Sequence, residues 1–405
     1  MNRTILHCDC NSFFASVETV LNPDYRGVPM AVCGSPEDRH GIVLAKNEEA
    51  KRYGIKTAET VYSAKRKCPE LVIASPHHDA YSEFSKRINA IYAEYTDLVE
   101  PFGIDESWLD VTASKRIFGS GERIAELIRE RIKREIGLTV SIGVSFNKVF
   151  AKLGSDYKKP DAVTVISKEN FKDIVYPLPV GDLLYVGRKT EQVLAAMGVR
   201  TIGNLAATSR ELLKMKLGKM GEMLYEYANG LDESPVSADN GAEIKSISNG
   251  FTFKHDLVSR EECRTGIEFL CDEIGARLRK RSLKCATVAL TIKDTYLRSI
   301  QRQRPLEFHT DISREISECA FDILCEEWSE SKPIRMITVS VSGLIDASHS
   351  YMQLDLFADA EENTRDKDRK REETLDTIRR KFGATSISTG AIIDSDIGVF
   401  RPKEK

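Results

Sequence analysis

Three acidic side chains at two distant places in the sequence could together hold divalent metal ions. Asp9 closes a short apolar run near the start of the chain, and Asp105 and Glu106 stand side by side much later. Carboxylate oxygens are the ligands that Mg²⁺ prefers in proteins. Taken alone, each cluster is ordinary turn or helix-cap chemistry, because Asp is common at both places. The hypothesis of a metal site therefore depends on the segments around them.

Those segments predict where each acid lies. Residues 4–9 have the pattern of a short β-strand, and residues 11–21 have the apolar spacing of a helix. Asp9 should therefore stand where a strand passes into a helix N-terminus, beside free backbone N–H groups that suit a polyphosphate and its Mg²⁺. The segment around Asp105 predicts a β-hairpin with both acids at its tip. Because adjacent residues of a regular strand face opposite ways, Glu106 can share the site only if the turn breaks that alternation.

The composition sets only broad limits. With 405 residues the chain is too long to fold around a single hydrophobic core, and its length predicts roughly three or four domains. With 59 basic and 62 acidic residues the formal charge is −3, so any nucleic-acid surface must be local. The nine cysteines form no CxxC pair, which predicts free thiols in a reducing cytoplasm. We expect neither a signal peptide nor a membrane span, because no apolar run approaches the roughly 20 residues that a span needs.

The pattern along the chain predicts two helix-backed sheets. Joining the segments on either side of residues 22–76 gives the order strand, helix, strand, strand, helix, strand, which is a ferredoxin-like sheet. On such a sheet Asp9 and the acidic hairpin come from neighbouring strands. Beyond a polar linker at 234–243, residues 247–341 again alternate strands and helices.

Two features suggest contact with nucleic acid. Within residues 178–205, Gly187 and Gly198 punctuate two short helical units, which resembles a helix-hairpin-helix element that presents backbone N–H groups to a DNA phosphate. Glycine-terminated helices are common, so this signal alone is weak. Residues 277–304 hold nine basic residues against one acid, Asp294, which favours a phosphate-facing surface over a merely solvated one. The nine are Arg277, Arg279, Lys280, Arg281, Lys284, Lys293, Arg298, Arg302 and Arg304.

The charged C-terminal tail, residues 358–405, contains one stretch with helical apolar spacing. Leu375, Ile378 and Phe382 predict one short amphipathic helix there. We assign this tail no chemistry.

Three segments resemble, in the same order, the motifs of the Y-family lesion-bypass DNA polymerases, whose bacterial polymerase IV branch is nearest. They are HCDCNSFFASVE at 7–18, GIDESWLD at 103–110 and GVSFNKVFAKLGSDYKKPDAVTVI at 143–166. The resemblance implies an α+β multidomain, right-hand polymerase with a ferredoxin-like palm, small inserted fingers, a helix-hairpin-helix thumb and an α/β little finger. Its expected boundaries are 1–21 with 77–166 for the palm, 22–76 for the fingers, 167–233 for the thumb, 234–243 for the linker and 244–345 for the little finger.

The resemblance also implies the chemistry. Asp9, Asp105 and Glu106, with the backbone carbonyl of Cys10, would hold two Mg²⁺ ions. The reaction would be in-line attack of a primer 3′-OH on the α-phosphorus of a dNTP, in which positioned cations and amides stabilise charge on the phosphate oxygens. The partners would be primer–template DNA and dNTP, and the protein would act as a monomer on DNA.

Further residues match positions of the family that contact the nucleotide or the DNA. Phe14 matches the steric gate, an aromatic ring in the space that a ribose 2′-OH would need, whereas the side chain of Phe13 is expected to pack in the core. The backbone N–H groups of Phe13 and Phe14 would bind the triphosphate, as would the side chains of Lys51 and Lys159. DNA contacts are expected at Gly187, Gly198, Lys284, Arg298, Arg302 and Arg304.

The fingers side departs from the pattern of the family. Glu48 and Lys51 stand where relatives usually have a tyrosine and an arginine. Lys51 keeps the charge but loses the bidentate fork. Glu48 would repel a triphosphate if it pointed inward, so we expect Lys46 or Arg52 to share the role. Asn11 replaces a frequent aspartate that is not a metal ligand in the family, so activity should survive.

The pentapeptide QLDLF at residues 353–357 resembles the bacterial sliding-clamp peptide, QLxLF. Its anchors would be Gln353, Leu354, Leu356 and Phe357, which can fill a groove of the clamp from an extended segment. Relatives often stop soon after this peptide, whereas this sequence continues to residue 405.

These observations support three hypotheses about function. The leading one is a template-directed, low-fidelity DNA polymerase for translesion synthesis. The second is a catalytically weakened scaffold that grips DNA and the clamp, motivated by Glu48 and Lys51, although the intact acidic set argues against it. The third is a helix-hairpin-helix repair nuclease. A primer-extension assay separates all three.

Overall fold

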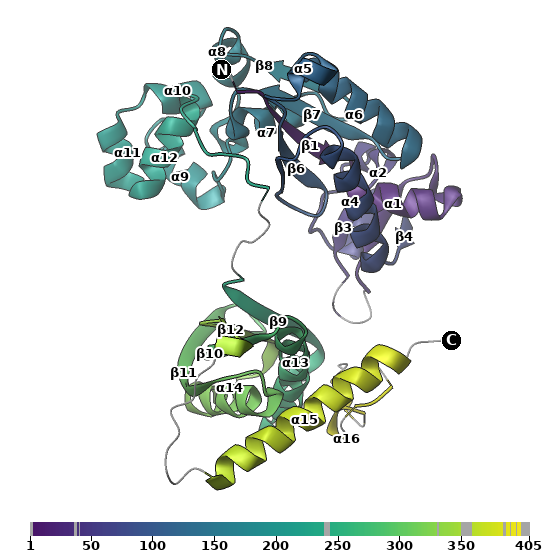
Figure 1. Cartoon of the computed structure of the whole chain (residues 1–405), viewed down its shortest axis with the longest axis vertical. Coiled ribbons are helices and arrows are strands. Elements are labelled where there is room, and N and C mark those ends of the chain that lie inside the picture. The colour runs from purple at the N-terminus through teal and green to yellow at the C-terminus, as the bar shows by residue number, and fades with distance from the viewer. Residues whose placement is uncertain are drawn as a thin grey trace. The chain divides into compact units, whose positions relative to one another are not determined.

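The computed structural model describes residues 3–35, 39, 41–238, 244–329, 332–349, 359–383, 386–388, 390–393 and 395–397, with only the backbone at 359–364, 391 and 393. The chain divides into two compact units (Figure 1). The first consists of Met1–Gly34 and Ile42–Ala242, and the second of Ser35–Gly41 and Glu243–Lys405. Each unit contains both helices and sheets, so the predicted α+β class is confirmed.

The first unit is built around a five-stranded sheet. Its strands pair in the order β5 (Val99–Pro101), β6 (Glu106–Asp110), β1 (Ile5–Cys10), β7 (Val140–Ser145) and β8 (Val163–Ile166). The central strand β1 runs antiparallel to both β6 and β7, whereas β7 and β8 are parallel. The acidic hairpin predicted from the sequence consists of β5 and β6, which pair directly. This order places Asp9 on the strand next to Glu106, as expected for neighbouring strands of one sheet.

Helices cover both faces of this sheet. The even-numbered residues of β1 point into a core shared with α4 (His78–Ala93) and α6 (Gly121–Glu135), which the short α5 (Lys115–Phe118) precedes. The odd-numbered residues face α7 (Lys148–Tyr157) on the other side. Because side chains alternate along a strand, His7 and Asp9 both face α7.

The helix α7 lies directly on the sheet because two glycines meet where it crosses β7. A Cβ atom added to Gly143 would stand 1.9 Å from the carbonyl oxygen of Ala151, and one added to Gly154 would stand 3.0 Å from the Cα atom of Gly143. Only glycine permits so close an approach at position 143. The contact brings the side chains of Lys152 and Ser155 over β1 and β6.

The inserted segment 22–76 forms a small sheet of its own. It contains η1 (Pro23–Tyr25), β2 (Met30–Cys33), β3 (Val43–Lys46), α2 (Glu48–Arg52), α3 (Val61–Lys67) and β4 (Val72–Ala74), and its strands pair in the order β3, β2, β4. The helix α1 (Phe13–Leu21) follows β1 and packs Ala15 against this sheet. The helix that begins beside Asp9 therefore also supports the insert.

The residues after β8 are helical. They form α8 (Phe171–Val175), η2 (Val180–Asp182), α9 (Arg188–Ala196), α10 (Ile202–Ala207), α11 (Arg210–Leu217) and α12 (Lys219–Ala228). These helices share a core that includes Leu194, Ile202 and Leu224. An all-helical segment at this place agrees with the helix-hairpin-helix prediction.

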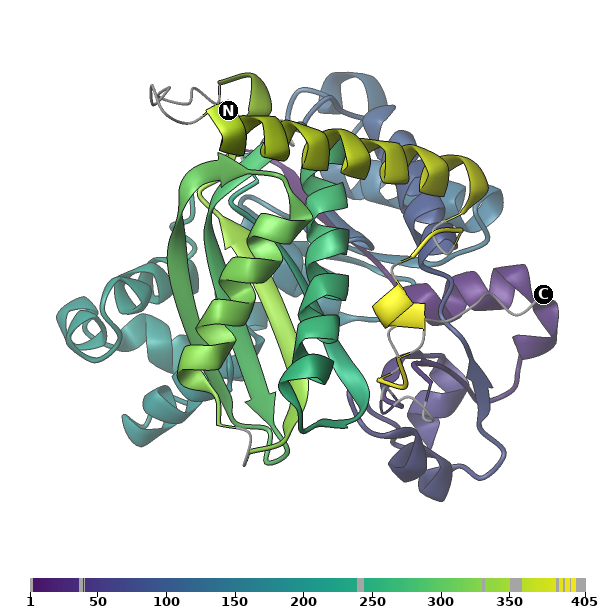
Figure 2. The same cartoon turned by 90° about the horizontal axis from the view of Figure 1, so that it is seen from below.

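The second unit is a sheet with two helices on one face (Figure 2). Its strands pair in the order β11 (Ser299–Thr310), β10 (Leu283–Asp294), β12 (Ile334–Ser342) and β9 (Ser246–Leu257), and the short β13 (Ile345–Asp346), which η3 (Ala347–His349) follows, pairs with β10. The helices α13 (Arg260–Lys280) and α14 (Ser313–Glu327) lie side by side and enclose the core against the sheet. The second helix-backed sheet predicted from the sequence is therefore confirmed.

The tail forms a much longer helix than the short one predicted from Leu375, Ile378 and Phe382. The helix α15 spans Asp359–Phe382, and α16 (Gly390–Ile393) follows it. Ion pairs hold α15 to the second unit. The guanidinium of Arg279, which is almost fully buried, bonds the carboxylates of Glu372 and Asp376. Apolar spacing alone predicts too short a helix here, because ion pairs join the described side chains of α15 to α13 and α14.

Glu372 also caps the helix α14. The residue before this helix is Ile312, whose side chain provides no cap. The carboxylate of Glu372 instead accepts hydrogen bonds from the backbone N–H and the hydroxyl of Ser313, each at 3.0 Å. Beyond α15, Ile392 and Ile397 are buried in the core of the same unit. The tail therefore supplies both a helix cap and part of the core.

Replacing Glu372 with alanine should loosen the start of α14, because the N–H of Ser313 loses its acceptor and the guanidinium of Arg279 loses one of its two carboxylate partners. Leaving a buried donor unsatisfied costs about 1–3 kcal/mol, so amide hydrogen exchange at the start of α14 should accelerate at least about fivefold in the full-length protein. The control is Glu373→Ala, since that side chain is 53% exposed. Equal exchange in both variants would contradict the capping role.

Candidate active site

Asp9 stands near the end of β1, opposite Glu106 on β6 and Ser141 on β7. The ammonium of Lys159 lies 2.8 Å from Oδ2 of Asp9 and 2.7 Å from Oδ1 of Asp156. Burial acts to lower the pKa of Lys159, but the two carboxylates hold it above its usual value, so the lysine stays charged. A predicted metal ligand and a predicted triphosphate ligand therefore meet in the structure.

Asp105 belongs to the turn of the hairpin and not to the strand. β6 begins at Glu106, so the alternation of a regular strand does not apply between the two acids. The backbone carbonyl of Asp105 accepts a hydrogen bond from the N–H of Cys10 at 3.0 Å, which ties the turn to β1. Burial, together with repulsion from Asp9 and Glu106, raises the pKa of Asp105 to about 6. A cation that entered the site would lower this pKa and favour the ionised carboxylate.

Glu106 faces a polar cluster on the α7 side of the sheet. The ammonium of Lys152 bonds Oε2 of Glu106, and Nε2 of His7 lies 3.2 Å from the same oxygen. Burial alone would raise the pKa of Glu106, but the ammonium of Lys152 holds it below its usual value. The carboxylate is therefore ionised at neutral pH.

His7 is fully buried, and its two ring nitrogens have different surroundings. Nδ1 lies 2.8 Å from the hydroxyl oxygen of Ser155, and that hydroxyl donates to the carbonyl of Lys152. Nδ1 must therefore carry the proton and donate it to Ser155, which leaves Nε2 with a lone pair. Burial lowers the pKa of His7 and keeps the ring neutral. Within the described ranges, Nε2 has no aligned hydrogen-bond partner.

This donor set fits a hard divalent cation. Asp9, Glu106 and His7 place one ligand atom each within 4.8 Å of one another. Asp105 lines the same cavity as Asp9 and adds a third carboxylate. Carboxylate oxygens favour ions such as Mg²⁺, Mn²⁺ and Ca²⁺ over softer metals. The lone pair of His7 gives the site a further polar atom that an ion or its water could satisfy.

A cavity of about 370 Å³ opens beside Asp9 and Asp105. Its lining comes from the turn after β1, from the insert and from the end of α7. The lining residues are Asp9, Cys10, Asn11, Ser12, Phe13, Phe14, Leu44, Ala45, Lys46, Lys51, Thr57, Ile104, Asp105 and Lys159. The acids, the two aromatic residues and the lysines that the sequence analysis singled out are thus brought together, except Glu106, which faces α7.

Phe14 is held in the cavity wall by stacking. Its ring lies on that of Tyr81, with centroids 4.1 Å apart and planes at 12°. Tyr81 is fully buried, and its hydroxyl donates a hydrogen bond to the buried carboxylate of Glu18. The side chain of Phe13 is 4% exposed and packs in the core, as predicted. The two neighbouring phenylalanines therefore have different roles.

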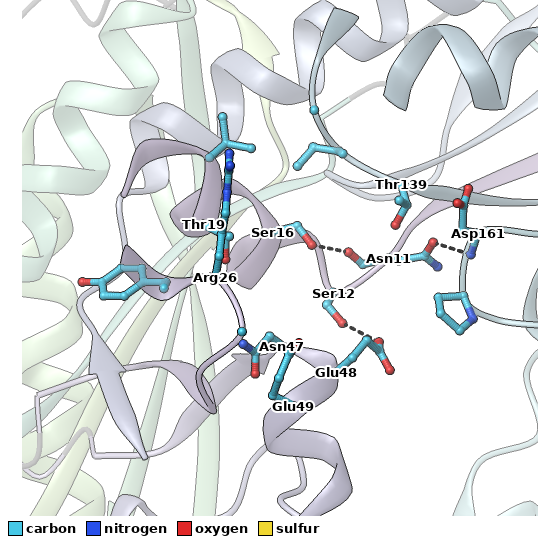
Figure 3. A pocket seen from close by; sticks show the side chains of 16 residues that line it. Asn11, Ser12, Ser16, Thr19, Arg26, Asn47, Glu48, Glu49, Thr139 and Asp161 are labelled. Atoms are coloured by element: carbon cyan, nitrogen blue, oxygen red, sulfur yellow. Dashed lines mark hydrogen bonds between the residues drawn. The ribbon is translucent and has the colours of Figure 1, made fainter. Parts of the chain in front are cut away.

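Glu48 is already paired on the fingers side of the cavity. Its Oε1 accepts hydrogen bonds from the hydroxyl of Ser12 at 3.3 Å and from the ammonium of Lys51 at 2.5 Å. Figure 3 shows Glu48 and Ser12 turned toward each other in an adjoining cavity of about 430 Å³. The pairing reduces the repulsion that this carboxylate would exert on a bound anion.

Asn11 holds the turn after β1 in place. Its Nδ2 donates to the hydroxyl of Ser141 at 2.9 Å. Its Oδ1 accepts from the N–H of Asp161 at 2.9 Å (Figure 3). Asp161 in turn forms ion pairs with Arg129 and Lys133. An amide can both donate and accept in this bridge, whereas an ionised aspartate can only accept. The residue at position 11 thus has a structural role here.

The glycines expected to contact DNA border one helix of the thumb. Gly187 is the residue before α9, and Gly198 follows that helix with a φ of +79°, a backbone conformation that favours glycine. A Cβ atom on either would meet no heavy atom within 4 Å, so both turns are open. The segment 353–357, which resembles a clamp peptide, lies outside the described residues.

The basic residues of the second unit are partly neutralised. Arg302 and Arg304 turn toward α14, where they bond Glu327 and Glu326 at 3.1 and 2.6 Å. Arg279 is buried against α15. Counting charges along the sequence therefore overestimates the positive surface, because the pairing acids come from distant segments.

Sequence reasoning missed four residues that support the site. They are His7, Tyr81, Lys152 and Ser155. His7 could have been found from the alternation of β1, since it lies two residues before Asp9 on the same face. Lys152 and Ser155 are three residues apart on one face of α7, which is also a readable signal. No local pattern indicates Tyr81, because its contact with Phe14 joins distant parts of the chain.

The sequence matches three known families. Residues 8–156 match the impB/mucB/samB family, and residues 244–356 match the C-terminal domain of that family. Residues 181–232 match a family described as the DNA polymerase iota thumb domain. The matches cover the palm and fingers, the little finger and the thumb of the predicted architecture.

Full-length relatives give the same result. A DNA polymerase IV from Acetivibrio thermocellus is 50% identical over 97% of this chain and 98% of its own length. The DNA polymerase IV of Clostridium kluyveri is 36% identical over 97% of this chain and 99% of its own. Among solved structures, a Y-family DNA polymerase chimera of Dbh and Dpo4 has a TM-score of 0.75 at 22% identity, and the match covers 84% of this chain and 99% of the chimera.

The fold, the acidic site and these relatives define a polymerase, and the chain belongs to the Y-family of DNA polymerases. This family depends on divalent metal ions, in agreement with the donors around Asp9. Within it the chain stands among the DNA polymerases IV, so it is a DNA-directed DNA polymerase of translesion synthesis that binds template DNA. In the part of the chain that is described, no helix is long and apolar enough to cross a membrane.

Lys159 should compete with metal ions for Asp9 as long as no nucleotide is bound. Lys159→Met keeps most of the side chain and removes the charge, so Mn²⁺ should bind about three- to tenfold more tightly, equivalent to roughly 1 kcal/mol of lost repulsion. Titration followed by electron paramagnetic resonance, without nucleotide or DNA, measures this affinity. The control is Lys158→Met, an exposed neighbour. An unchanged affinity in Lys159→Met would contradict the competition.

Proposed function

We propose that Asp9, Asp105 and Glu106, with the backbone carbonyl of Cys10, bind two Mg²⁺ ions and that the enzyme uses them to add dNTPs to a primer 3′-OH. The observation that carries this proposal is the cavity in which Asp9 and Asp105 meet Lys159. When bound, the ions would activate the 3′-OH and neutralise the triphosphate and the leaving pyrophosphate.

The chain's own groups position the triphosphate. The ammonium of Lys159 can leave the carboxylate of Asp9 and bind a phosphate oxygen, because both are negatively charged hydrogen-bond acceptors. The N–H groups of Phe13 and Phe14 begin the helix α1, and Ser12 before them provides no side-chain cap. These amides are therefore available to phosphate oxygens, which helix N-termini favour.

Phe14 is the proposed steric gate. Its stacking on Tyr81 fixes the plane of the ring, and such aromatic pairs contribute about 0.5–1.5 kcal/mol beyond their buried area. The ring therefore resists moving aside for a ribose 2′-OH. The chain of contacts from Phe14 through Tyr81 to Glu18 makes the gate a rigid part of the palm.

The exposed face of the second sheet supports contact with primer–template DNA. α13 and α14 cover one face, and the middle of the opposite face carries uncharged residues, most of them small. In register these are Gln303, Ala289, Ser340 and Ser248 in one row, and Gln301, Thr291, Thr338 and Gly250 in the next. Lys293 and Met336 lie in the row beyond these, so the two rows named are the part of this face that can approach a phosphate backbone closely. We propose that Lys284 and Arg298 near the ends of β10, and the open turns at Gly187 and Gly198, hold phosphates.

Arg302 and Arg304 can join this surface only by exchanging their partners. Each is bonded to a glutamate at the end of α14, on the helix side of the sheet. Exposed pairs of this kind are worth only about 0–1 kcal/mol, so a DNA phosphate can replace the glutamate at little cost. We therefore propose that both arginines also contact the DNA after this exchange.

We further propose that residues 353–357 bind the bacterial sliding clamp, with Gln353, Leu354, Leu356 and Phe357 as anchors. The support is the sequence of this segment and its place after the second sheet. The enzyme would act on DNA as a monomer that the clamp tethers.

The scaffold hypothesis has less support than catalysis. Its motivation was the pair Glu48 and Lys51, and these two residues are bonded to each other and do not exclude an anion from the cavity. A scaffold would have no need of three carboxylates whose charges repel one another. A catalytic metal site therefore explains Asp9, Asp105 and Glu106 better than a DNA-binding scaffold does.

Asp105→Asn should abolish most primer extension, because the amide keeps the shape of the side chain but cannot supply the charge that holds the ions. We expect a loss of at least about a hundredfold, or roughly 2.7 kcal/mol of transition-state stabilisation. The assay uses the full-length enzyme with Mg²⁺, dNTPs and a primed template. The matched control is Asp97→Asn, an exposed residue of the palm. Extension by Asp105→Asn at the wild-type rate would exclude the proposed site.

Phe14→Ala should admit ribonucleotides, because the space for the 2′-OH opens. The ratio of kcat/KM for dNTP over the matching ribonucleotide should fall at least about tenfold, whereas Phe14→Tyr, which keeps the ring, should stay near the wild-type ratio. Tyr81→Ala should shift the ratio in the same direction by a smaller amount, since the ring loses its support. If Phe14→Ala discriminates as well as the wild type, another group is the gate.

A further inference from the structure

The cavity beside Asp9 and Asp105, called the nucleotide cavity below, is lined by Lys46, Lys51 and Lys159, and these lysines have different partners. Lys159 is bonded to Asp9 and Asp156 by the contacts described above. Lys51 is bonded to Glu48. The ammonium of Lys46 instead donates to the neutral hydroxyl of Thr57 at 3.0 Å, and across the described residues it takes part in no ion pair. The cavity therefore contains one lysine whose charge has no direct counterion.

The backbone at Lys46 is firmly fixed. Lys46 is the last residue of β3 and pairs with Ala31 of β2. The next residue, Asn47, accepts hydrogen bonds from the N–H groups of Met30 and Ala50 at 3.0 Å each, so it pins the strand and caps α2 at once. The side chain of Lys46 therefore enters the cavity from a rigid strand end.

The surroundings of Lys46 disfavour its charge. Burial, followed by repulsion from Lys51, lowers the pKa of Lys46, although Glu48 and Glu59 act in the opposite direction. Both acids are engaged elsewhere, Glu48 with Lys51 and Glu59 with Lys67. An anion that entered the cavity between Lys46 and Lys51 would relieve this repulsion and supply the missing counterion.

We propose that Lys46 is the fingers-side ligand of the terminal phosphates of the dNTP, in place of the tyrosine that the family usually has two positions later. The proposal rests on the function proposed above, because it assigns a residue to the same nucleotide cavity. Thr57 orients the ammonium, and Glu48 keeps Lys51 beside it. The fingers side then still offers a hydrogen-bond donor to the phosphates, supplied by Lys46 and not by the residue at position 48.

The first test measures nucleotide affinity by single-turnover primer extension with the full-length enzyme. Lys46→Met, which keeps most of the side chain, should raise the apparent Kd for dNTP about tenfold and change the rate at saturation much less. Lys46→Arg should restore most of the affinity. The control is Lys56→Met, an exposed lysine of the same insert outside the cavity lining.

A second measurement separates phosphate binding from a general disturbance of the fingers. Inhibition by added pyrophosphate should weaken in Lys46→Met by about the same factor as dNTP affinity, because both ligands use the same charge. Sugar discrimination, which depends on Phe14, should stay unchanged. A misfolded insert would alter both properties and would not be rescued by Lys46→Arg, and that outcome would overturn the assignment.

The outcomes distinguish this inference from the proposed function. If the wild-type enzyme extends no primer, the function itself fails. If the wild type extends and Lys46→Met binds dNTP and pyrophosphate as the wild type does, only the role of Lys46 is wrong.

Discussion

Repulsion among three carboxylates at one end of the central sheet is the constraint on which the first unit depends. Like charges this close cost several kcal/mol in a partly buried site unless positive charge is placed beside them. Lys152 and Lys159 supply that charge, one from within α7 and one just after it. Their position requires α7 to lie flat on β7, which the absence of a side chain at Gly143 permits. A packing detail inside the sheet thus sets the electrostatics of the site.

Local sequence pattern was sufficient to predict the elements but not all their partners. The strand that ends near Asp9 and the hairpin that carries Asp105 follow from residues within a few positions of each. Lys152 was missed because its partner, Glu106, comes within reach only where α7 crosses the sheet. The alternation of β1 places His7 on the face of Asp9, but its contact with Ser155 also depends on that crossing. The tail was predicted as one short helix for a related reason, since hydrophobic spacing does not register ion pairs with distant helices. Repulsion by Glu48 was expected only because its partners were unknown.

The fingers combine a small surface with a high density of charge. They consist of three short strands and two short helices, and they line the cavity with Leu44, Ala45, Lys46, Lys51 and Thr57. Charge acts on phosphates, which all four dNTPs share, whereas discrimination between bases by contact requires closely fitted walls. A site that holds the triphosphate and the sugar more firmly than the base suits an enzyme that copies damaged templates.

The tail changes the order in which the chain can fold during synthesis. Domains generally fold as units from the N-terminus as the ribosome makes them. Among the described residues, the last one in the core of the first unit is Val236, so this core can form once the segment up to Val236 has emerged. The second unit must wait until Ile397 is available, since α14 has no cap before Glu372 and its core lacks two isoleucines. Through that interval its sheet and helices are synthesised but lack part of their core and the cap of α14.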